Sequence, residues 1–267
     1  INSDSFDNDN AGTLIDQRQT VIDGTIGSGN YDIGHTFSTG GGGLAQLNSP
    51  CTGSKARGIT GLPAPVGDAY DIDFVAHELG HQFGAPHTFN GDAGNCAGGN
   101  RTASNAYEPG SGSTIMAYAG ICAPQNVQGN SDPYFHQKSL QMIWDNVTTG
   151  NSQCATTTNS GNNAPTSNAG ADYIIPNSTP YMLTGTSTDA DGTGTHTYTW
   201  EQYDLGPAGL PLETNTSGPM VRAFEGTSSP TRFIPRMPDL LQAQGSTTWE
   251  KLASVARTQD FRLTVRD

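Results

Sequence analysis

The chain has 267 residues, with 12 Lys and Arg against 25 Asp and Glu, and a formal net charge of -13 at pH 7. This charge repels phosphate backbones and anionic lipid headgroups, so we expect neither nucleic acid nor a membrane surface as a partner. No apolar run approaches the roughly 20 residues that span a bilayer, which also argues against membrane insertion.

The first part of the chain predicts one short helix and one strand. Apolar residues fall at helical spacing between Leu14 and Ile22, and the helix is expected to end near Gly24. The alternation of apolar and polar residues over 31–37 predicts a strand. This strand runs into consecutive glycines at 40–43, which indicate a bend that exposes the backbone.

A second helix is predicted after a loop that contains Pro63 and Pro65. Asp68 is the expected N-cap. One apolar face follows it, and Gly84 stands where a helix C-terminus favours glycine. The residues of that face are Ile72, Val75, Ala76, Leu79 and Phe83.

A long irregular loop and a third helix come next. Residues 88–113 are rich in Gly and Asn and have no apolar period, so we expect a loop held by cysteines. Asp132 and Pro133 predict a helix start, with a cap followed by proline at the first helical position. Phe135, Leu140, Ile143 and Val147 would face inward, and the helix would end before Gly150.

The remaining sequence indicates a second domain, as the chain length also suggests. Residues 156–166 have the Thr, Asn, Ser and Gly composition of a linker. Short β-rich runs separated by turn residues follow over 167–267, a pattern typical of an immunoglobulin-like sandwich with Trp200 in its core. The runs span residues 173–175, 181–183, 196–200, 231–234 and 261–265.

The four cysteines contain no Cys-x-x-Cys pair of the kind that binds structural zinc. Two disulfides formed in an oxidising compartment are the simpler interpretation. The first residues do not resemble a signal peptide. We therefore expect a secreted, extracellular protein whose signal sequence has already been removed.

The strongest chemical signal lies inside the second predicted helix. His77 and His81 stand four residues apart, so a helix places both imidazoles on one face as two zinc ligands. Gly84 lets the chain turn so that His87 returns as the third ligand. Glu78 is then the general base that takes a proton from zinc-activated water. The alternative, ordinary surface histidines, is weak, because chance produces this spacing in roughly one such chain in a hundred thousand.

A second alternative is an inactive adhesion or carbohydrate-binding protein that keeps zinc only for its structure. Glu78 argues against it, since a structural site has no use for a base. The favoured function is therefore the hydrolysis of peptide bonds in proteins, with zinc as the cofactor and protein or peptide substrates as partners.

The His77 to His87 pattern and a later turn, Ser113 to Tyr118 around Met116, resemble the metzincin clan of zinc endopeptidases. The resemblance implies an α+β catalytic domain over residues 1–155, ahead of the all-β immunoglobulin-like sandwich. The clan has a sheet and a long helix ahead of the edge strand. The resemblance therefore also implies that this domain lacks its N-terminal part, and that an upstream fragment of the same protein is a candidate partner.

Within the clan the chain is most similar to bacterial reprolysin-like enzymes, the relatives of adamalysins. That resemblance implies two disulfides, Cys51 to Cys154 and Cys96 to Cys122. It also implies two stretches that bind substrate and line the specificity pocket. These are the edge-strand residues Gly42, Gly43, Leu44 and Ala45, and the residues Ala119, Gly120 and Ile121 after the turn.

The sequence departs from adamalysins at two positions. Thr88 follows the third histidine where adamalysins have Asp, as in pappalysin-like enzymes. Tyr118 stands two residues after the turn methionine, as in astacins and serralysins, which implies a role in binding zinc or stabilising the oxyanion.

Calcium is a weaker expectation. Asp189 and Asp191 precede Gly192 in a turn of the kind that binds Ca²⁺ in extracellular sandwiches, although a solvated turn is the commoner case. Asp92, Asn95 and Glu108 around the irregular loop are a similar candidate set. We interpret His35, His136 and His196 as structural or surface residues.

Overall fold

The structure is a computed structural model, and it describes residues 6–242 and 247–267. The chain divides into two compact units, residues 1–86 with 138–157 and residues 87–137 with 158–267. We call residues 87–137 the loop segment and residues 158–267 the C-terminal region. The predicted division into domains 1–155 and 167–267 with a linker at 156–166 stays a prediction. Among the described helices, none has the length and apolarity needed to cross a bilayer.

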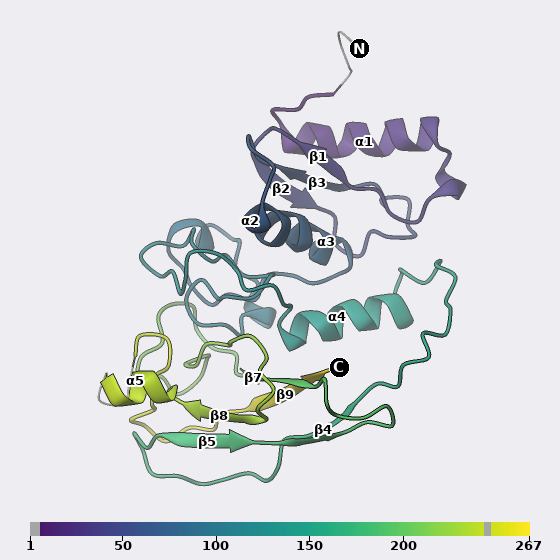
Figure 1. Ribbon diagram of the computed structural model, residues 1–267. Helices are drawn as coiled ribbons and strands as arrows, with labels where there is room; N and C mark the ends of the chain where they lie inside the picture. The colour runs from purple at the N-terminus through teal and green to yellow at the C-terminus, as the bar shows by residue number, and fades with distance from the viewer. Residues whose placement is uncertain (1–5, 243–246) are drawn as a thin grey trace. The chain divides into compact units, whose positions relative to one another are not determined.

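The first unit is built around a small sheet with a helix on each face (Figure 1). The strands are β1 (Thr36–Ser38), β2 (Gly42–Ala45) and β3 (Gly58–Gly61). β3 lies in the middle, parallel to β1 and antiparallel to β2. Leu14 and Ile15 of α1 (Ala11–Thr25) pack on Ile59 of β3 and form the core on that face. The other face carries α3 (His77–Gln82). β2 is an edge strand of the sheet and lies beside this helix.

The first helix is confirmed, whereas the first strand is shorter than predicted. α1 begins after Asn10, whose Oδ1 accepts a hydrogen bond from the Thr13 backbone N–H at 3.1 Å. The strand predicted over 31–37 is wrong up to residue 35, because only Thr36–Ser38 is extended and paired. The central strand β3 was not predicted, since Gly-Ile-Thr-Gly shows no alternation, yet all four residues are buried.

The second predicted helix is present but is not one regular α-helix. It consists of α2 (Asp68–Tyr70), a wider π-helical stretch (Asp71–Ala76) and α3. The predicted cap is wrong, because Asp68 lies within the first turn and Gly67 stands at the N-cap. Gly84 ends the helix as predicted, with a φ of 104°.

The face that α3 buries is polar, in contrast to the predicted apolar face. The predicted apolar residues are only half-buried, whereas His77, Glu78 and Gln82 are buried. The Gln82 amide binds His35 Nδ1 at 2.7 Å and donates to the Gly34 carbonyl at 3.1 Å. The polar side chains of α3 therefore face inward, and apolar contacts contribute less to the packing of this helix than the sequence suggests.

The third helix, α4 (Gln137–Thr148), begins five residues later than Asp132. The backbone over 132–134 is held in another conformation. Asp132 N–H donates to the Ser113 carbonyl, and Tyr134 O accepts from Ile115 N–H. Near its end, Asn146 Nδ2 donates to the Phe83 carbonyl at 2.9 Å, which ties this helix to the end of α3.

The loop segment is irregular, as predicted for residues 88–113, with two short 3-10 turns (Gly94–Cys96 and Ala103–Asn105). The chain forms two disulfides, Cys51–Cys154 and Cys96–Cys122, with Cα atoms 5.6 and 5.3 Å apart. These are the pairings that the resemblance implied.

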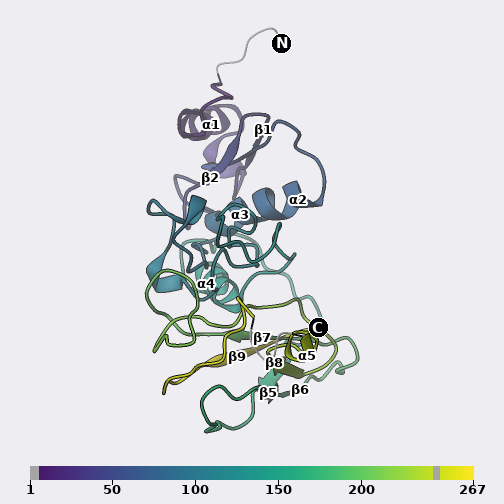
Figure 2. The same ribbon diagram turned by 90° about the vertical axis from the view of Figure 1, so that its left-hand side faces the viewer.

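The C-terminal region forms three two-stranded antiparallel sheets and a short helix, α5 (Met237–Gln242). The pairs are β4 (Thr166–Asn168) with β6 (Thr186–Thr188), β5 (Tyr181–Thr184) with β8 (Thr231–Ile234), and β7 (Thr197–Gln202) with β9 (Phe261–Arg266). Figure 2 shows β7 beside β9 and α5 near β8.

Four of the five predicted strands are present, and Trp200 is buried as expected. The run at 173–175 is wrong, because these residues are unpaired and Ile174 is fully exposed. β4 and β6 were missed because their Thr, Ser and Asn residues carry no apolar pattern. The immunoglobulin-like sandwich is not confirmed by these small sheets and stays a prediction.

Candidate metal centre

Three histidines come together in one continuous stretch of chain. The ligand nitrogens of His77, His81 and His87 all lie within 4.8 Å of one another. His77 and His81 stand one helical turn apart on α3, and their rings meet edge to face with centroids 4.7 Å apart. The turn at Gly84 then brings His87 back toward them. Three imidazoles at this separation match the donor set of a zinc ion.

Two of these imidazoles are oriented by backbone carbonyls. His81 Nδ1 lies 2.7 Å from the Ala85 carbonyl oxygen, and His87 Nδ1 lies 2.7 Å from that of Asn100. Because a carbonyl can only accept, each Nδ1 carries the proton, and Nε2 is the unprotonated nitrogen of the neutral ring. Burial lowers the pKa of His87, which also favours the neutral, metal-binding form. Such outer contacts fix the tautomer and orientation of metal ligands.

Glu78 lies between the two helical histidines in sequence and is buried, with 7% of its surface exposed. Its Oε2 is buried without a hydrogen-bond partner among the residues that the structure describes. Burial raises the pKa of this carboxyl to about 8. A buried carboxylate oxygen needs a partner, and water beside a divalent cation would satisfy it. The residues therefore fit a zinc ion, which His77, His81 and His87 would hold.

The edge strand β2 lies directly against the Glu78 carboxylate. A Cβ atom built on Gly43 would lie 2.0 Å from Glu78 Oε1 and 2.5 Å from its Cδ. Only glycine leaves room for the carboxylate at this position. Gly42 and Leu44 on either side are exposed. The structure thus places the predicted edge-strand residues next to the predicted base.

A buried carboxylate that the sequence suggested only as a calcium ligand holds the turn around Met116. Glu108 is 2% exposed. Its Oε1 accepts from the Thr88 hydroxyl at 2.7 Å, and its Oε2 accepts from the backbone N–H of Ser113 at 2.7 Å and of Thr114 at 3.1 Å. The Thr114 hydroxyl also donates to Oε1. Thr88 directly follows His87. The Glu108 carboxylate therefore links the residue after the third histidine to the turn around Met116.

The remaining predicted site residues lie near this carboxylate network. Met116 is fully buried, and its carbonyl accepts from Thr88 N–H at 3.1 Å. The Tyr118 ring packs against His87 and Phe89, with centroid distances of 4.5 and 4.7 Å.

Of the residues predicted to follow the turn in the specificity pocket, Ala119 is buried and Ile121 is exposed. The signal that could have revealed this role of Glu108 is an acid in a Gly-rich loop shortly before a turn with several backbone donors.

Replacing Glu108 by alanine is expected to destabilise the fold. The substitution leaves several buried donors without an acceptor, and each costs about 1 to 3 kcal/mol, so the total loss is expected to reach about 3 kcal/mol or more. Thermal unfolding measures it. Glu225→Ala, at an exposed position, is the control and should change the melting temperature little. Equal melting temperatures for Glu108→Ala and wild type would show that the network does not stabilise the turn.

The predicted calcium ligands are occupied by contacts within the chain. Asp191 accepts from Asn163 N–H at 2.7 Å, and Asp189 accepts from Asp191 N–H at 2.8 Å. Over residues 6–242 and 247–267, the His77, His81 and His87 group is the metal-binding cluster of three or more side chains that the structure shows. Calcium is therefore not supported.

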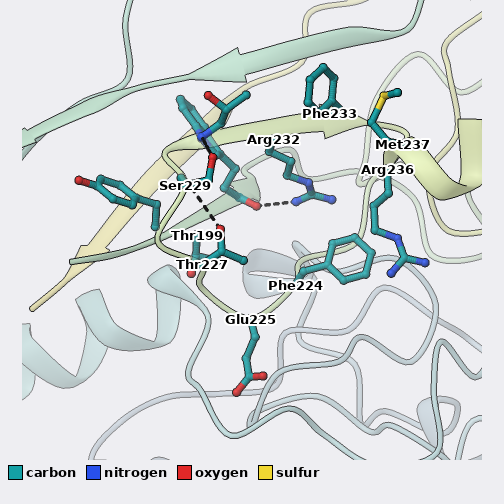
Figure 3. Close-up of a pocket in the computed structure, with 12 residues that line it drawn as sticks. Thr199, Phe224, Glu225, Thr227, Ser229, Arg232, Phe233, Arg236 and Met237 are labelled. Carbon is teal, nitrogen blue, oxygen red and sulfur yellow. Dashed lines mark hydrogen bonds between the residues drawn. The ribbon is translucent and has the colours of Figure 1, made fainter. Parts of the chain in front are cut away.

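The C-terminal region contains a separate pocket of about 230 Å³ (Figure 3). It lies among β7, β8 and the start of α5, with Phe224, Arg232 and Arg236 among its lining residues. None of the candidate site residues lines it, so its walls do not contribute to the metal centre.

Comparison with known proteins gives one finding. A model of the reprolysin-like metallopeptidase family M12B matches residues 2–148. No curated protein and no solved structure was found to match the chain. The matched residues contain all three histidines, Glu78, the edge strand β2 and the turn around Met116.

Proposed function

The chain belongs to the reprolysin-like M12B family of metallopeptidases, and we propose that it is a secreted zinc endopeptidase whose metal ligands are His77, His81 and His87. The family is one of zinc metallopeptidases. The observation that carries the proposal is the convergence of three histidines, whose ligand nitrogens lie within 4.8 Å of one another. Two disulfides are consistent with secretion into an oxidising compartment.

The carboxylate of Glu78 performs the proton transfers in this proposal. Zinc held by these histidines would supply a Lewis acid that polarises the scissile carbonyl and acidifies a water molecule. Glu78 Oε2, buried and without a protein partner among the described residues, accepts a proton from that water. The same carboxyl then donates the proton to the departing amine, so Glu78 returns to its starting state at the end of each turnover.

The residues around Glu78 bind and orient the substrate in the same proposal. β2 is an edge strand, so its outer backbone groups can pair with an extended peptide next to the Glu78 carboxylate. Tyr118, packed on the His87 ring, stabilises the oxyanion. The stretch from Ala119 to Ile121 is the proposed wall of the specificity pocket.

The experiment is cleavage of a denatured protein by the chain loaded with one equivalent of zinc. Cleavage is expected, with loss on addition of a chelator and recovery on addition of zinc, because the three neutral imidazoles release the metal to a stronger ligand. Metal content is measured on the same samples. Protein that carries zinc at one equivalent and still cleaves nothing would contradict the proposed function.

Gly43→Ala is expected to lower turnover while leaving fold and zinc content intact. The new methyl group would overlap Glu78 from its carboxylate to its Cγ, so this side chain would have to turn away from the position that it now occupies. A displacement of about 1 Å in a catalytic group can reduce the rate roughly 100-fold. Initial rates on a peptide substrate measure the effect.

Gly41→Ala is the matched control, because a Cβ atom there meets nothing within 4 Å. This variant should keep the wild-type rate. If Gly43→Ala were as active as Gly41→Ala, the Glu78 carboxylate would not need the position that the structure gives it.

A further inference from the structure

The loop segment, residues 87–137, has little means of folding alone. Its secondary structure consists of short 3-10 turns, an isolated β-bridge between Phe89 and Glu108 and the first residue of α4, and it is rich in glycine and asparagine. Yet it holds His87, Glu108, Met116 and Tyr118 in defined positions. Buried backbone groups outside helices and sheets must find partners elsewhere. The structure supplies many of these partners from the C-terminal region, within the same compact unit.

An aromatic stack joins the two parts beside Glu108. The rings of Tyr107 and Tyr203 lie parallel, with centroids 4.2 Å apart and planes at 5°. The Arg262 guanidinium covers Tyr203 at 3.6 Å from its centroid. Tyr107 is 7% exposed, so the stack buries the residue directly before the carboxylate that holds the turn. Stacked aromatic pairs add stability beyond the area that they bury.

A second contact lies at the end of the loop segment. Glu201 of β7 is fully buried, and its carboxylate accepts from the Gln137 backbone N–H at 3.1 and 3.2 Å. Arg262 donates to Gln137 Oε1 at 2.8 Å, and Arg266 donates to the Phe135 carbonyl at 3.1 Å. A buried carboxylate that accepts backbone N–H groups fixes the chain strongly, because losing it leaves buried donors unpaired.

A third contact lies shortly after His87. Asn90 Nδ2 donates to the Pro207 carbonyl at 2.9 Å, and the Asn90 carbonyl accepts from Gly209 N–H at 2.9 Å. Arg101 donates to the Gly206 carbonyl at 2.8 Å and to Asn90 Oδ1. Asn90 lies three residues after His87, and Arg101 directly follows Asn100, whose carbonyl orients the His87 ring. Both residues are thus attached to residues 206–209.

The fourth contact reaches the turn itself. Arg222 pairs with Asp132, whose backbone N–H donates to the Ser113 carbonyl, and the Ser113 hydroxyl donates to the Ala223 carbonyl at 3.4 Å. Figure 3 shows the neighbouring Phe224 beside Arg232 and Arg236. The Arg222 guanidinium lies over the same ring, 4.4 Å from its centroid, which holds this arginine in place.

We infer that the C-terminal region is not an independent appended module but the scaffold on which the loop segment folds, so that the positions of His87, Glu108 and Tyr118 depend on it. The loop segment is attached to the scaffold near its start, in its middle and at its end. The inference concerns folding and stands whether or not the chain is a peptidase.

The first test cuts the full-length chain between the two predicted domains. A specific protease site is inserted between Gly161 and Asn162, where the chain is exposed. After cleavage, the two fragments are expected to co-elute on size exclusion, with hydrogen exchange of the loop segment unchanged. If the fragments separate and the loop segment then exchanges its amide hydrogens faster, the result would also show that the loop segment depends on the C-terminal region. Separation with unchanged exchange of the loop segment in the N-terminal fragment would overturn the inference.

The second test weakens one contact in the intact chain. Tyr203→Ala removes the stack on Tyr107 and is expected to raise the exchange rates of the Ser113 and Thr114 amides by at least about tenfold. Tyr173→Ala is the matched control, since this tyrosine of the same region is 76% exposed. Equal exchange rates in both variants would overturn the inference. If Tyr203→Ala fails to fold, the cut chain still decides.

Discussion

Glu78→Gln is expected to reduce turnover by about 100 to 10,000 fold, the usual range for loss of a general base, while the protein keeps its fold and its zinc. The reason lies in the division of roles at the site. In the proposed function the three histidines bind the metal, and backbone carbonyls orient two of them. Glu78 follows His77 in the chain and is buried, with one carboxylate oxygen unpartnered in the described structure. Glutamine fills the same space but cannot accept and return the proton.

The measurement is the initial rate on a denatured protein, with zinc content determined for each sample. Glu213→Gln is the matched control, because it makes the same chemical change at a half-exposed side chain away from the histidines. Equal rates for Glu78→Gln and Glu213→Gln would mean that another group is the base. Loss of zinc in Glu78→Gln would mean that the carboxylate is a ligand.

His81→Ala is expected to lose both zinc and activity. Residues that only orient a ligand contribute roughly 10 to 100 fold to metal affinity, so removing the ligand itself should weaken binding by more than about 100-fold. Competition with a chromophoric chelator measures the affinity. Because metal binding stabilises the folded form, the melting temperature should rise on adding zinc to wild type but not to the variant.

His196→Gln is the control for this variant, since His196 is a buried histidine that binds Ser187 in the C-terminal region. It should keep the zinc affinity of wild type. An unchanged affinity in His81→Ala would contradict the assignment of the metal centre to the three histidines, whatever the effect on activity.

The histidine cluster could be predicted from sequence because its three members are close together along the chain. A helical repeat places His77 and His81 on one face, and a glycine at the helix end returns His87 to them. Such local rules need no knowledge of distant residues. Glu108 illustrates the opposite case, since its role depends on donors at Thr88, Ser113 and Thr114 that only the folded loop brings together.

The fold was less predictable where apolar patterning is weak. The central strand β3 carries two glycines, and its burial comes from neighbours on both faces rather than from its own sequence. The helix with the histidines buries Gln82 instead of the apolar residues that suggested an amphipathic face. Asp132 and Pro133 look like a helix start but are held by the turn at Ser113. In each case a tertiary contact decided the local structure.

The Cys51–Cys154 bond affects when, after synthesis, the folded site becomes stable. It closes a stretch with a sequence separation of 103 that includes all three histidines, Glu78 and the turn around Met116. Cross-linking a loop of about 100 residues removes denatured-state entropy worth roughly 4 to 5 kcal/mol in the chain-entropy model. A newly made chain in a reducing compartment lacks that contribution, so its site would be more often unfolded. Under the proposed function, export to an oxidising environment would thus act as a maturation step that delays proteolysis until the chain has left the cell.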